Sequence, residues 1–151
     1  MIGGLSMGIQ AAWIDDNKLA IEMTFSGDWD WNEFYACSGL IATMFSNVEY
    51  PIDVIIDLRN SKKVQADFFV HLHLTDLYRK NAGKIIIVQS NTDQFSLFNQ
   101  FRNKTTDAKV CREVLYAGTM KEAYSIAERM YCARQKALKA GPNRFLSLLI
   151  S

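Results

Sequence analysis

The 151-residue chain carries 17 Lys and Arg against 16 Asp and Glu, and 49% of it is hydrophobic. This length fits one domain with its own core, and the composition is typical of globular proteins and not of disordered ones. The net charge of +1 gives no electrostatic reason to expect a nucleic-acid or anionic-membrane partner. No apolar run approaches the roughly 18 residues of a membrane-spanning helix. We therefore expect a cytoplasmic protein without a membrane span.

Cysteine usage points to the same compartment. Cys37, Cys111 and Cys132 are widely spaced and form no CxxC pair, so we expect reduced thiols and neither a disulfide framework nor a zinc site. Residues 1–7 lack the basic and long apolar regions of a signal peptide. We expect them to form a flexible N-terminus.

The first elements that the sequence predicts are two short strands, 8–14 and 19–25. Between them lies the Asp-Asp-Asn-Lys segment 15–18, which is turn chemistry between apolar segments and predicts a β-hairpin. Apolar and polar residues alternate along the second strand. This period of two turns Glu22 towards water and buries the other face.

A helix is expected next. Asp30, with Glu33 three residues later, resembles a capping box, and Pro51 marks the end of the segment. Between Asp30 and Pro51, apolar residues recur at helical spacing, and they are Phe34, Cys37, Ile41, Met44, Phe45 and Val48.

The rest of the chain alternates between short β-branched runs and helical segments. The expected elements are a strand buried on both faces at 52–58, a helix at 68–81 with Asp67 as N-cap and an end near Gly83, a strand at 84–89, a helix from Asn91 or Thr92, a strand at 113–117, and a helix that opens with the capping box Thr119–Glu122 and ends before Gly141.

This order, β-β-α-β-α-β-α-β-α, predicts an α/β domain. The sheet should be mixed and mostly parallel, with the hairpin as an antiparallel edge. We expect one domain over residues 8–136 and an apolar C-terminal tail over 137–151 that packs on the domain or on a second subunit.

Four polar residues superficially match the spacing of a phosphoacceptor receiver domain, and they are Asp15, Asp16, Asp57 and Ser90. A receiver has a helix directly after its acid pair, whereas 19–25 has the pattern of a strand. It also needs a lysine after its last strand, and none follows Ala117. We therefore favour Asp15 and Asp16 as turn residues and Asp57 as a residue that forms hydrogen bonds beyond its strand.

Catalytic and metal sites have little support. His71 and His73 are two residues apart on a predicted helix and face different directions, so we expect structural histidines. Cys37 lies on the apolar stripe of its helix, which favours a packed thiol. The motifs GxSxG, GxxxxGK[ST], GxGxxG and HExxH do not occur. We expect no enzyme activity, no metal and no cofactor.

Two places, together with the apolar start of the second helix, favour contact with a protein partner. One is the start of the first helix, where the two tryptophans either pack in the core, which we favour, or leave one ring exposed as an anchor for a partner. The other is the loop after strand 52–58, at the carboxyl end of the sheet. With the apolar start of the second helix, the expected contact residues are Trp29, Trp31, Asn60, Ser61, Lys62, Lys63, Phe68 and Phe69.

The segments GDWDWNEF, PIDVIIDLRNS, KIIIVQSN and GTMKEAYSIAERM, in this order after a hairpin, resemble the STAS family of anti-sigma-factor-antagonist-like (SpoIIAA-like) domains. The likeness covers roughly residues 8–134. It implies a non-enzymatic module that regulates a partner protein by docking. The family's phosphorylatable D-S-[ST]-G motif is not carried over, because Phe68 and Phe69 follow Asp67 where the serine and its neighbour would lie.

Our leading hypothesis is therefore a STAS-like regulatory or scaffold module with an unknown protein partner, and with a homodimer through the apolar tail. An alternative is a carrier of a small apolar ligand, with the nine Phe and six Met residues lining a pocket. A phosphoacceptor receiver is the third alternative.

Overall fold

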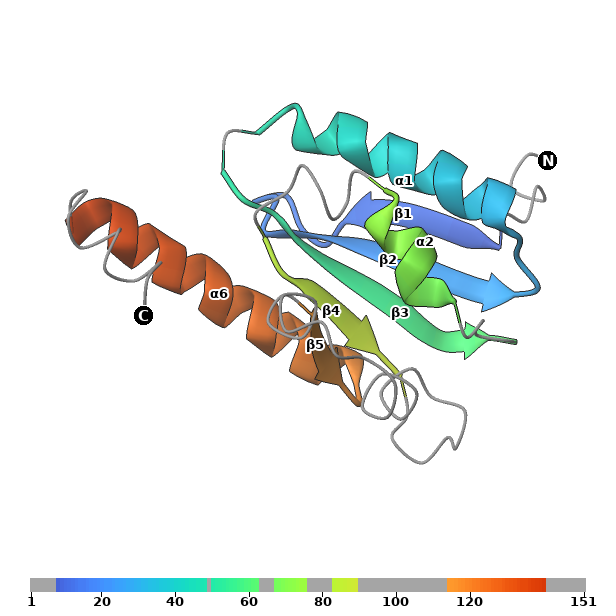
Figure 1. Ribbon diagram of the computed structural model, residues 1–151. Helices are drawn as coiled ribbons and strands as arrows, with labels where there is room; N and C mark the ends of the chain where they lie inside the picture. Colours follow the sequence, from blue (N-terminus) through green and yellow to red (C-terminus); the bar gives the residue numbers. More distant parts are fainter. Residues whose placement is uncertain (1–7, 49, 63–66, 76–82, 90–113, 141–151) are drawn as a thin grey trace.

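The fold is an α/β domain around one mixed five-stranded sheet (Figure 1). The computed structural model describes residues 8–48, 50–62, 67–75, 83–89 and 114–140. The strands lie side by side in chain order. β1 is antiparallel to β2, and each later pair of neighbours is parallel. This confirms the predicted class. The elements are β1 (Ile9–Trp13), β2 (Ala20–Gly27), α1 (Trp31–Phe45), β3 (Asp53–Ser61), α2 (Phe68–His73), β4 (Ile85–Val88), β5 (Val114–Ala117) and α6 (Met120–Ala140).

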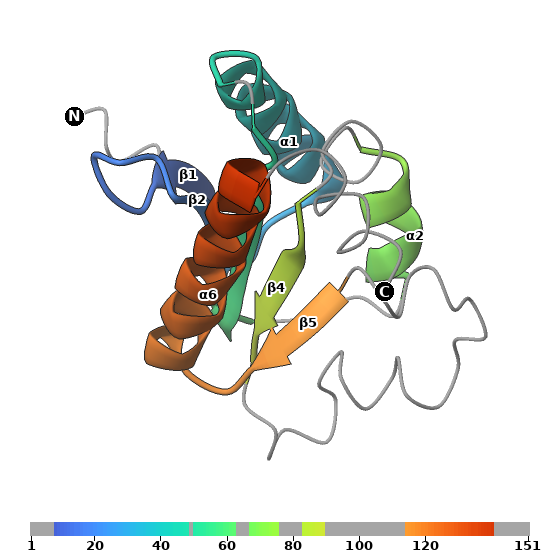
Figure 2. The ribbon, with the colours of Figure 1, turned by 90° about the vertical axis from the view of Figure 1, so that its left-hand side faces the viewer.

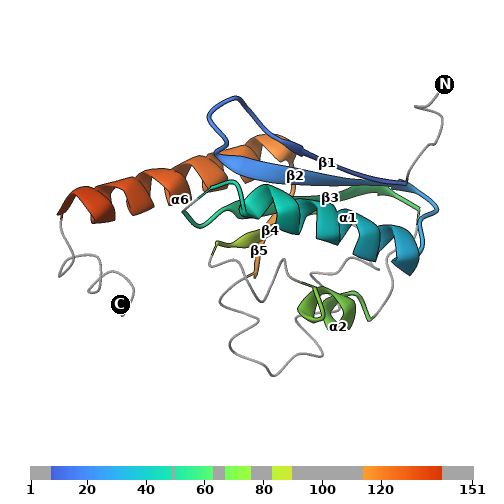
Figure 3. The same ribbon diagram turned by 90° about the horizontal axis from the view of Figure 1, so that it is seen from above.

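Helices cover both faces of the sheet (Figures 2 and 3). α1 and α2 lie on one face because the chain crosses from β2 to β3 and from β3 to β4 in the same direction, and right-handed crossovers then place both helices on one side. α6 lies on the other face, over β3, β4 and β5. None of the helices in the described segments is long and apolar enough to cross a membrane.

The opening hairpin forms as predicted. Trp13 pairs with Ile21 at its closed end. In the turn, the Asp15 side chain accepts a hydrogen bond from the Leu19 amide at 3.3 Å, and Lys18 adopts a positive φ of 55°. Asp15 therefore helps to reverse the chain, because its side chain bonds to the local backbone.

Alternation along β2 and β3 divides the core into two layers. On β2, Ile21, Met23 and Phe25 are buried towards α1, whereas Glu22 and Thr24 are only half-buried on the opposite face. β3 is buried at each residue from Asp53 to Leu58. The predictions of a one-sided β2 and of a central strand covered on both faces are confirmed.

The two capping boxes form in part. The Asp30 carboxylate accepts a hydrogen bond from the Glu33 amide at 2.8 Å, and the Thr119 hydroxyl accepts one from the Glu122 amide at 3.1 Å. The glutamates do not bond back to the cap residue itself. Glu33 accepts from the amide of Gly8, at 2.9 Å, and so fastens the start of β1 to α1.

Two predicted bounds differ from the structure, those of the second helix and of the tail, and one predicted helix cannot be compared with it. α2 spans only Phe68–His73, and the Asp67 side chain does not cap it because its carboxylate lies 3.2 Å from His71 Nε2 instead. The helix expected from Asn91 or Thr92 lies outside the described residues, so the described order is β-β-α-β-α-β-β-α. α6 ends at Ala140, before Gly141 as predicted, so residues 137–140 belong to this helix and not to the tail.

A buried ion pair joins the C-terminal half of α6 to the first residue of β3. The Asp53 side chain is fully buried, and its Oδ1 accepts hydrogen bonds from the Lys84 amide, at 2.7 Å, and from Arg134 of α6. Arg134 also donates to the carbonyl of Pro51 at 3.5 Å. A buried carboxylate needs such a partner, because an unpaired buried charge is strongly destabilising.

Removing the arginine should therefore lower the free energy of unfolding more than a surface substitution does. We expect Arg134→Met to lower the free energy of unfolding at pH 7 by about 3 kcal/mol, since the Asp53 charge loses its partner. Arg129→Met is the matched control, because Arg129 is exposed on the same helix, and it should change stability by less than about 0.5 kcal/mol. Urea unfolding measures both, and the double variant Asp53→Asn/Arg134→Met should recover part of the loss. Equal losses for Arg134→Met and Arg129→Met would contradict the pairing.

Candidate functional site

The carboxyl ends of β2 and β3 meet at one edge of the sheet, where α1 and α2 also begin. Gly27 pairs with Ser61 as the last pair of the two strands. Gly27 has a positive φ of 60°, a conformation that glycine adopts readily, and the chain turns there towards α1. Because ligands and partners of open α/β sheets meet the carboxyl ends of the strands, this edge is the first place to seek a site.

Five aromatic rings pack together at this edge, and we call them the aromatic corner. The Trp29 and Trp31 centroids are 4.9 Å apart at 85°, and the Phe25 and Trp29 centroids are 5.0 Å apart at 74°. These edge-to-face contacts are the favoured geometry for aromatic pairs. The rings come from β2, the start of α1 and the start of α2, so the corner fixes both helices to the sheet. Its members are Phe25, Trp29, Trp31, Phe34 and Phe68.

Both tryptophans are half-buried. Both rings pack against the core and against each other, which confirms the favoured interpretation of core packing. Trp29 Nε1 donates a hydrogen bond to Ser61 Oγ at 2.8 Å, which holds the end of β3 against the corner. Phe68 was predicted as a contact residue, but it is fully buried, so it anchors α2 and presents no contact surface to a partner.

The other predicted contact residues are less constrained. Lys62 forms a 3.5 Å ion pair with Asp28, and both side chains are exposed, so the pair contributes little. Asn60 is exposed and pairs with Ser26 in the sheet. Lys63 and the side chain of Phe69 lie outside what the structure describes. The structure thus brings Trp29, Trp31, Ser61 and the buried Phe68 together, and whether the first three serve a partner stays a prediction.

His71 is the functional candidate that sequence reasoning missed. Its ring stacks on Trp31, with centroids 3.8 Å apart at 15°. Its Nδ1 lies 2.7 Å from the Tyr35 hydroxyl of α1, and its Nε2 lies 3.2 Å from the Asp67 carboxylate. If the carboxylate accepts from Nε2–H, neutral Nδ1 accepts from the phenol, so the three groups hold one tautomer. The sequence does contain a signal for this group, because Asp67 and His71 are four residues apart, and so are Trp31 and Tyr35. Residues at this spacing are neighbours on a helix.

The outer surface of α1 and α2 beside His71 is apolar. Val70 is 63% exposed and Leu74 is 59% exposed, and their spacing of four places them on one face of α2. Tyr35 is 37% exposed and reaches this surface from α1. We call Tyr35, Val70, His71 and Leu74 the α1–α2 strip. Exposed apolar residues that gather in this way mark interaction surfaces.

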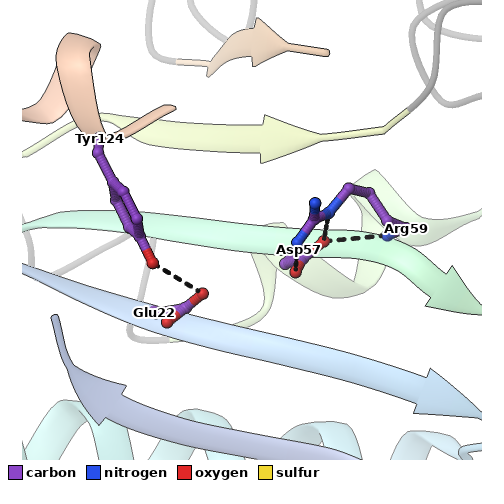
Figure 4. Close-up of polar contacts among 4 residues, drawn as sticks. All are labelled: Glu22, Asp57, Arg59 and Tyr124. Carbon is purple, nitrogen blue, oxygen red and sulfur yellow. Dashed lines mark hydrogen bonds and ion pairs between the residues drawn. The ribbon is translucent and has the colours of Figure 1, made fainter. Parts of the chain in front are cut away.

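Polar side chains lie on the opposite face of the sheet, beside α6 (Figure 4). Both Asp57 oxygens accept from Arg59, with Nε and one terminal nitrogen each at 2.9 Å. This hydrogen bond raises the pKa of Arg59 above its ordinary value. Tyr124 donates to Glu22 at 3.4 Å, and burial, followed by the charge of Glu22, raises the pKa of Tyr124. The phenol therefore remains a donor at neutral pH.

This geometry bears on the metal and receiver interpretations. Asp57 lies inside β3 opposite Thr24, whereas Asp15 and Asp16 lie in the turn before the other end of β2. The three carboxylates do not converge, and Ser90 is not among the described residues. Within the described ranges, no three His, Cys, Asp or Glu side chains are grouped so that they could hold a metal ion.

A double-mutant cycle on Trp29 and Ser61 tests whether their hydrogen bond stabilises the aromatic corner. Ser61→Ala should lower the free energy of unfolding by about 1 kcal/mol, because the indole N–H loses its acceptor. In a Trp29→Phe background the same change should cost less, since the indole donor is already absent. Urea unfolding of the four proteins in this cycle measures the difference. The same cost in both backgrounds would show that the bond does not couple the two residues.

Thiol reactivity tests the packing of α1. Burial raises the pKa of the Cys37 thiol to about 11, whereas Cys132 is exposed. At pH 8 only about one Cys37 in a thousand is a thiolate, and the thiolate is the reactive form. We expect iodoacetamide to alkylate Cys132 and to spare Cys37 in the native protein, as peptide mass spectrometry would show. The Cys37 rate should rise as the pH approaches 11. Equal alkylation of the two residues at pH 8 would contradict this burial.

Comparisons of the chain with family models, with curated proteins and with solved structures find no match. The site is therefore interpreted from its own geometry.

Proposed function

We propose that the chain is a non-enzymatic, STAS-like regulatory or scaffold module that binds a partner protein through the α1–α2 strip. The observation that carries the proposal is the exposed apolar surface of α2 beside Tyr35 and His71. Val70 presents a β-branched side chain to solvent, and Tyr35 offers an apolar ring with a polar tip, the kind of residue that is enriched in binding hot spots.

The aromatic corner supports this proposal by making the strip rigid. Phe68 and Leu72 are fully buried under α2, and His71 is held at both ring nitrogens and stacked on Trp31. A surface that is fixed before binding loses less conformational entropy when the partner arrives. A short helix of six residues has little stability of its own, so its packing decides whether the strip exists.

The resemblance to STAS domains supports the same kind of function, since it implies docking on a protein partner. The absence of a serine at the start of α2 has a structural counterpart. Phe68 occupies that position and is buried among aromatic rings. A phosphorylated side chain there would require this packing to be replaced, so we propose constant docking without a phosphoserine switch.

The two alternatives have less support. An apolar carrier needs space between sheet and helices, whereas Phe25, Phe34 and Phe68 lie ring to ring, with centroids 5.6 to 6.1 Å apart, as in a filled core. A receiver needs a free carboxylate to accept the phosphoryl group, whereas both oxygens of Asp57 are bonded to Arg59.

Site-specific photocrosslinking tests the proposal. With p-benzoylphenylalanine at Val70, irradiation of cells that naturally produce the protein should give a defined covalent adduct with another protein. The matched control places the crosslinker at Ser125, which is exposed on α6. Adding Leu74→Asp should remove the Val70 adduct but leave the fold intact, because Leu74 is 59% exposed. Circular dichroism checks the fold, and adducts of equal yield at both positions, or at neither, would refute the α1–α2 strip as the binding surface.

A further inference from the structure

β1 forms one margin of the sheet, and its outer side has no neighbouring strand within the described chain. Its hydrogen-bonding directions follow from the hairpin. The carbonyl of Gly8 accepts from the Ser26 amide at 2.7 Å, and the amide of Ile14 donates to Ala20 at 3.0 Å. The backbone groups of an antiparallel strand point alternately to either side, so the even-numbered residues face β2. The N–H and C=O groups of Ile9, Ala11 and Trp13 therefore point away from the sheet.

Within the strand itself, β1 lacks the residues and irregularities that protect many edge strands. The sequence of β1 is IQAAW, with no charged residue and no proline. Its pairing with β2 is continuous, without a bulge. Natural proteins protect sheet edges with charges, prolines, bulges or covering elements, and an uncharged regular edge is a template for another strand.

We propose that β1 pairs with β1 of a second copy of the chain, antiparallel across a two-fold axis at Ala11, so that the two sheets become one. This inference does not depend on the proposed function, because it uses the sheet margin and not the α1–α2 strip. The register is determined by the backbone. Only the odd-numbered residues have backbone N–H and C=O groups that point away from β2, so these residues must face each other across the axis. A two-fold axis at Ala11 pairs all three of them.

The side chains fit this register. Ile9 lies opposite Trp13 of the second copy, which is the aromatic and β-branched cross-strand pair that stabilises sheets. Ala11 faces its own symmetry mate on the same side of the sheet, where its small side chain permits a close approach. On the other side, Gln10 lies opposite Ala12, and both are exposed in the monomer. The strand has no charge to oppose its own copy, so it is complementary to itself.

Size-exclusion chromatography with light scattering tests the proposal on the full chain. The wild-type protein should have twice the monomer mass of 17.2 kDa. Ala11→Pro removes an outward N–H and leaves the bonds to β2 in place, as proline allows on an edge strand, so this variant should be monomeric. Ala11→Lys should also be monomeric, because two like charges would meet at the axis.

An equimolar mixture of Ala11→Lys and Ala11→Glu should restore the double mass, because opposite charges then face each other across the axis. This rescue distinguishes lost pairing from a damaged fold, which a loss of circular dichroism in the single variants would reveal. A monomeric wild-type protein at about 100 µM would overturn the proposal. So would Ala11→Pro and Ala11→Lys variants that keep the double mass, because the copies would then meet through another surface.

Discussion

The packing of the domain depends on β3, the strand against which the helices on both faces of the sheet pack. Its residues are buried on both faces from Asp53 to Leu58, yet two of them are carboxylates that point towards α6. Buried carboxylates are tolerated only with charged or hydrogen-bonding partners. Each has an arginine: Asp53 pairs with Arg134 of α6, and Asp57 pairs with Arg59 of its own strand. The position of α6 is a consequence of this requirement and of packing.

The path of α6 determines which surfaces remain open. Between the two carboxylates lies Ile55, and α6 approaches this face with Ala123 and Ala127, small side chains that permit close packing. The helix lies mainly over β3, β4 and β5 and reaches β2 at Ala20 and Glu22. Among the described residues, no helix covers β1 on that face. Gln10 and Ala12 are exposed there, which leaves both the polar face and the β1 margin accessible.

Local signals in the sequence predicted the elements that form locally. The Asp-Asp-Asn turn, the period of two in β2, the buried run of β3 and the amide contacts at Asp30 and Thr119 are short-range interactions, and they are present as expected. The errors come from competition with tertiary contacts. Asp67 has the right residue type for an N-cap, but its carboxylate bonds to His71 instead.

The site was predicted less well because its contacts join distant residues. Trp29, Trp31 and Ser61 were identified from their places at helix starts and strand ends, and they do meet at one edge. Tyr35 and His71 are 36 residues apart, and Asp53 and Arg134 are 81 apart. No spacing rule relates such pairs until the topology brings α1 beside α2 and α6 across the sheet.

The two proposals together determine how such a protein would present itself to a partner. An antiparallel β1 pair whose side chains remain on their own faces requires a two-fold axis perpendicular to the sheet. α1 and α2 of both copies then lie on the same side of the joined sheet, and the two α1–α2 strips point in the same direction. A dimer of this kind can engage two sites on one partner, or two copies of it, and the second contact gains from the effective concentration set by the first. Weak individual contacts by a helix as short as α2 would then be enough for stable binding.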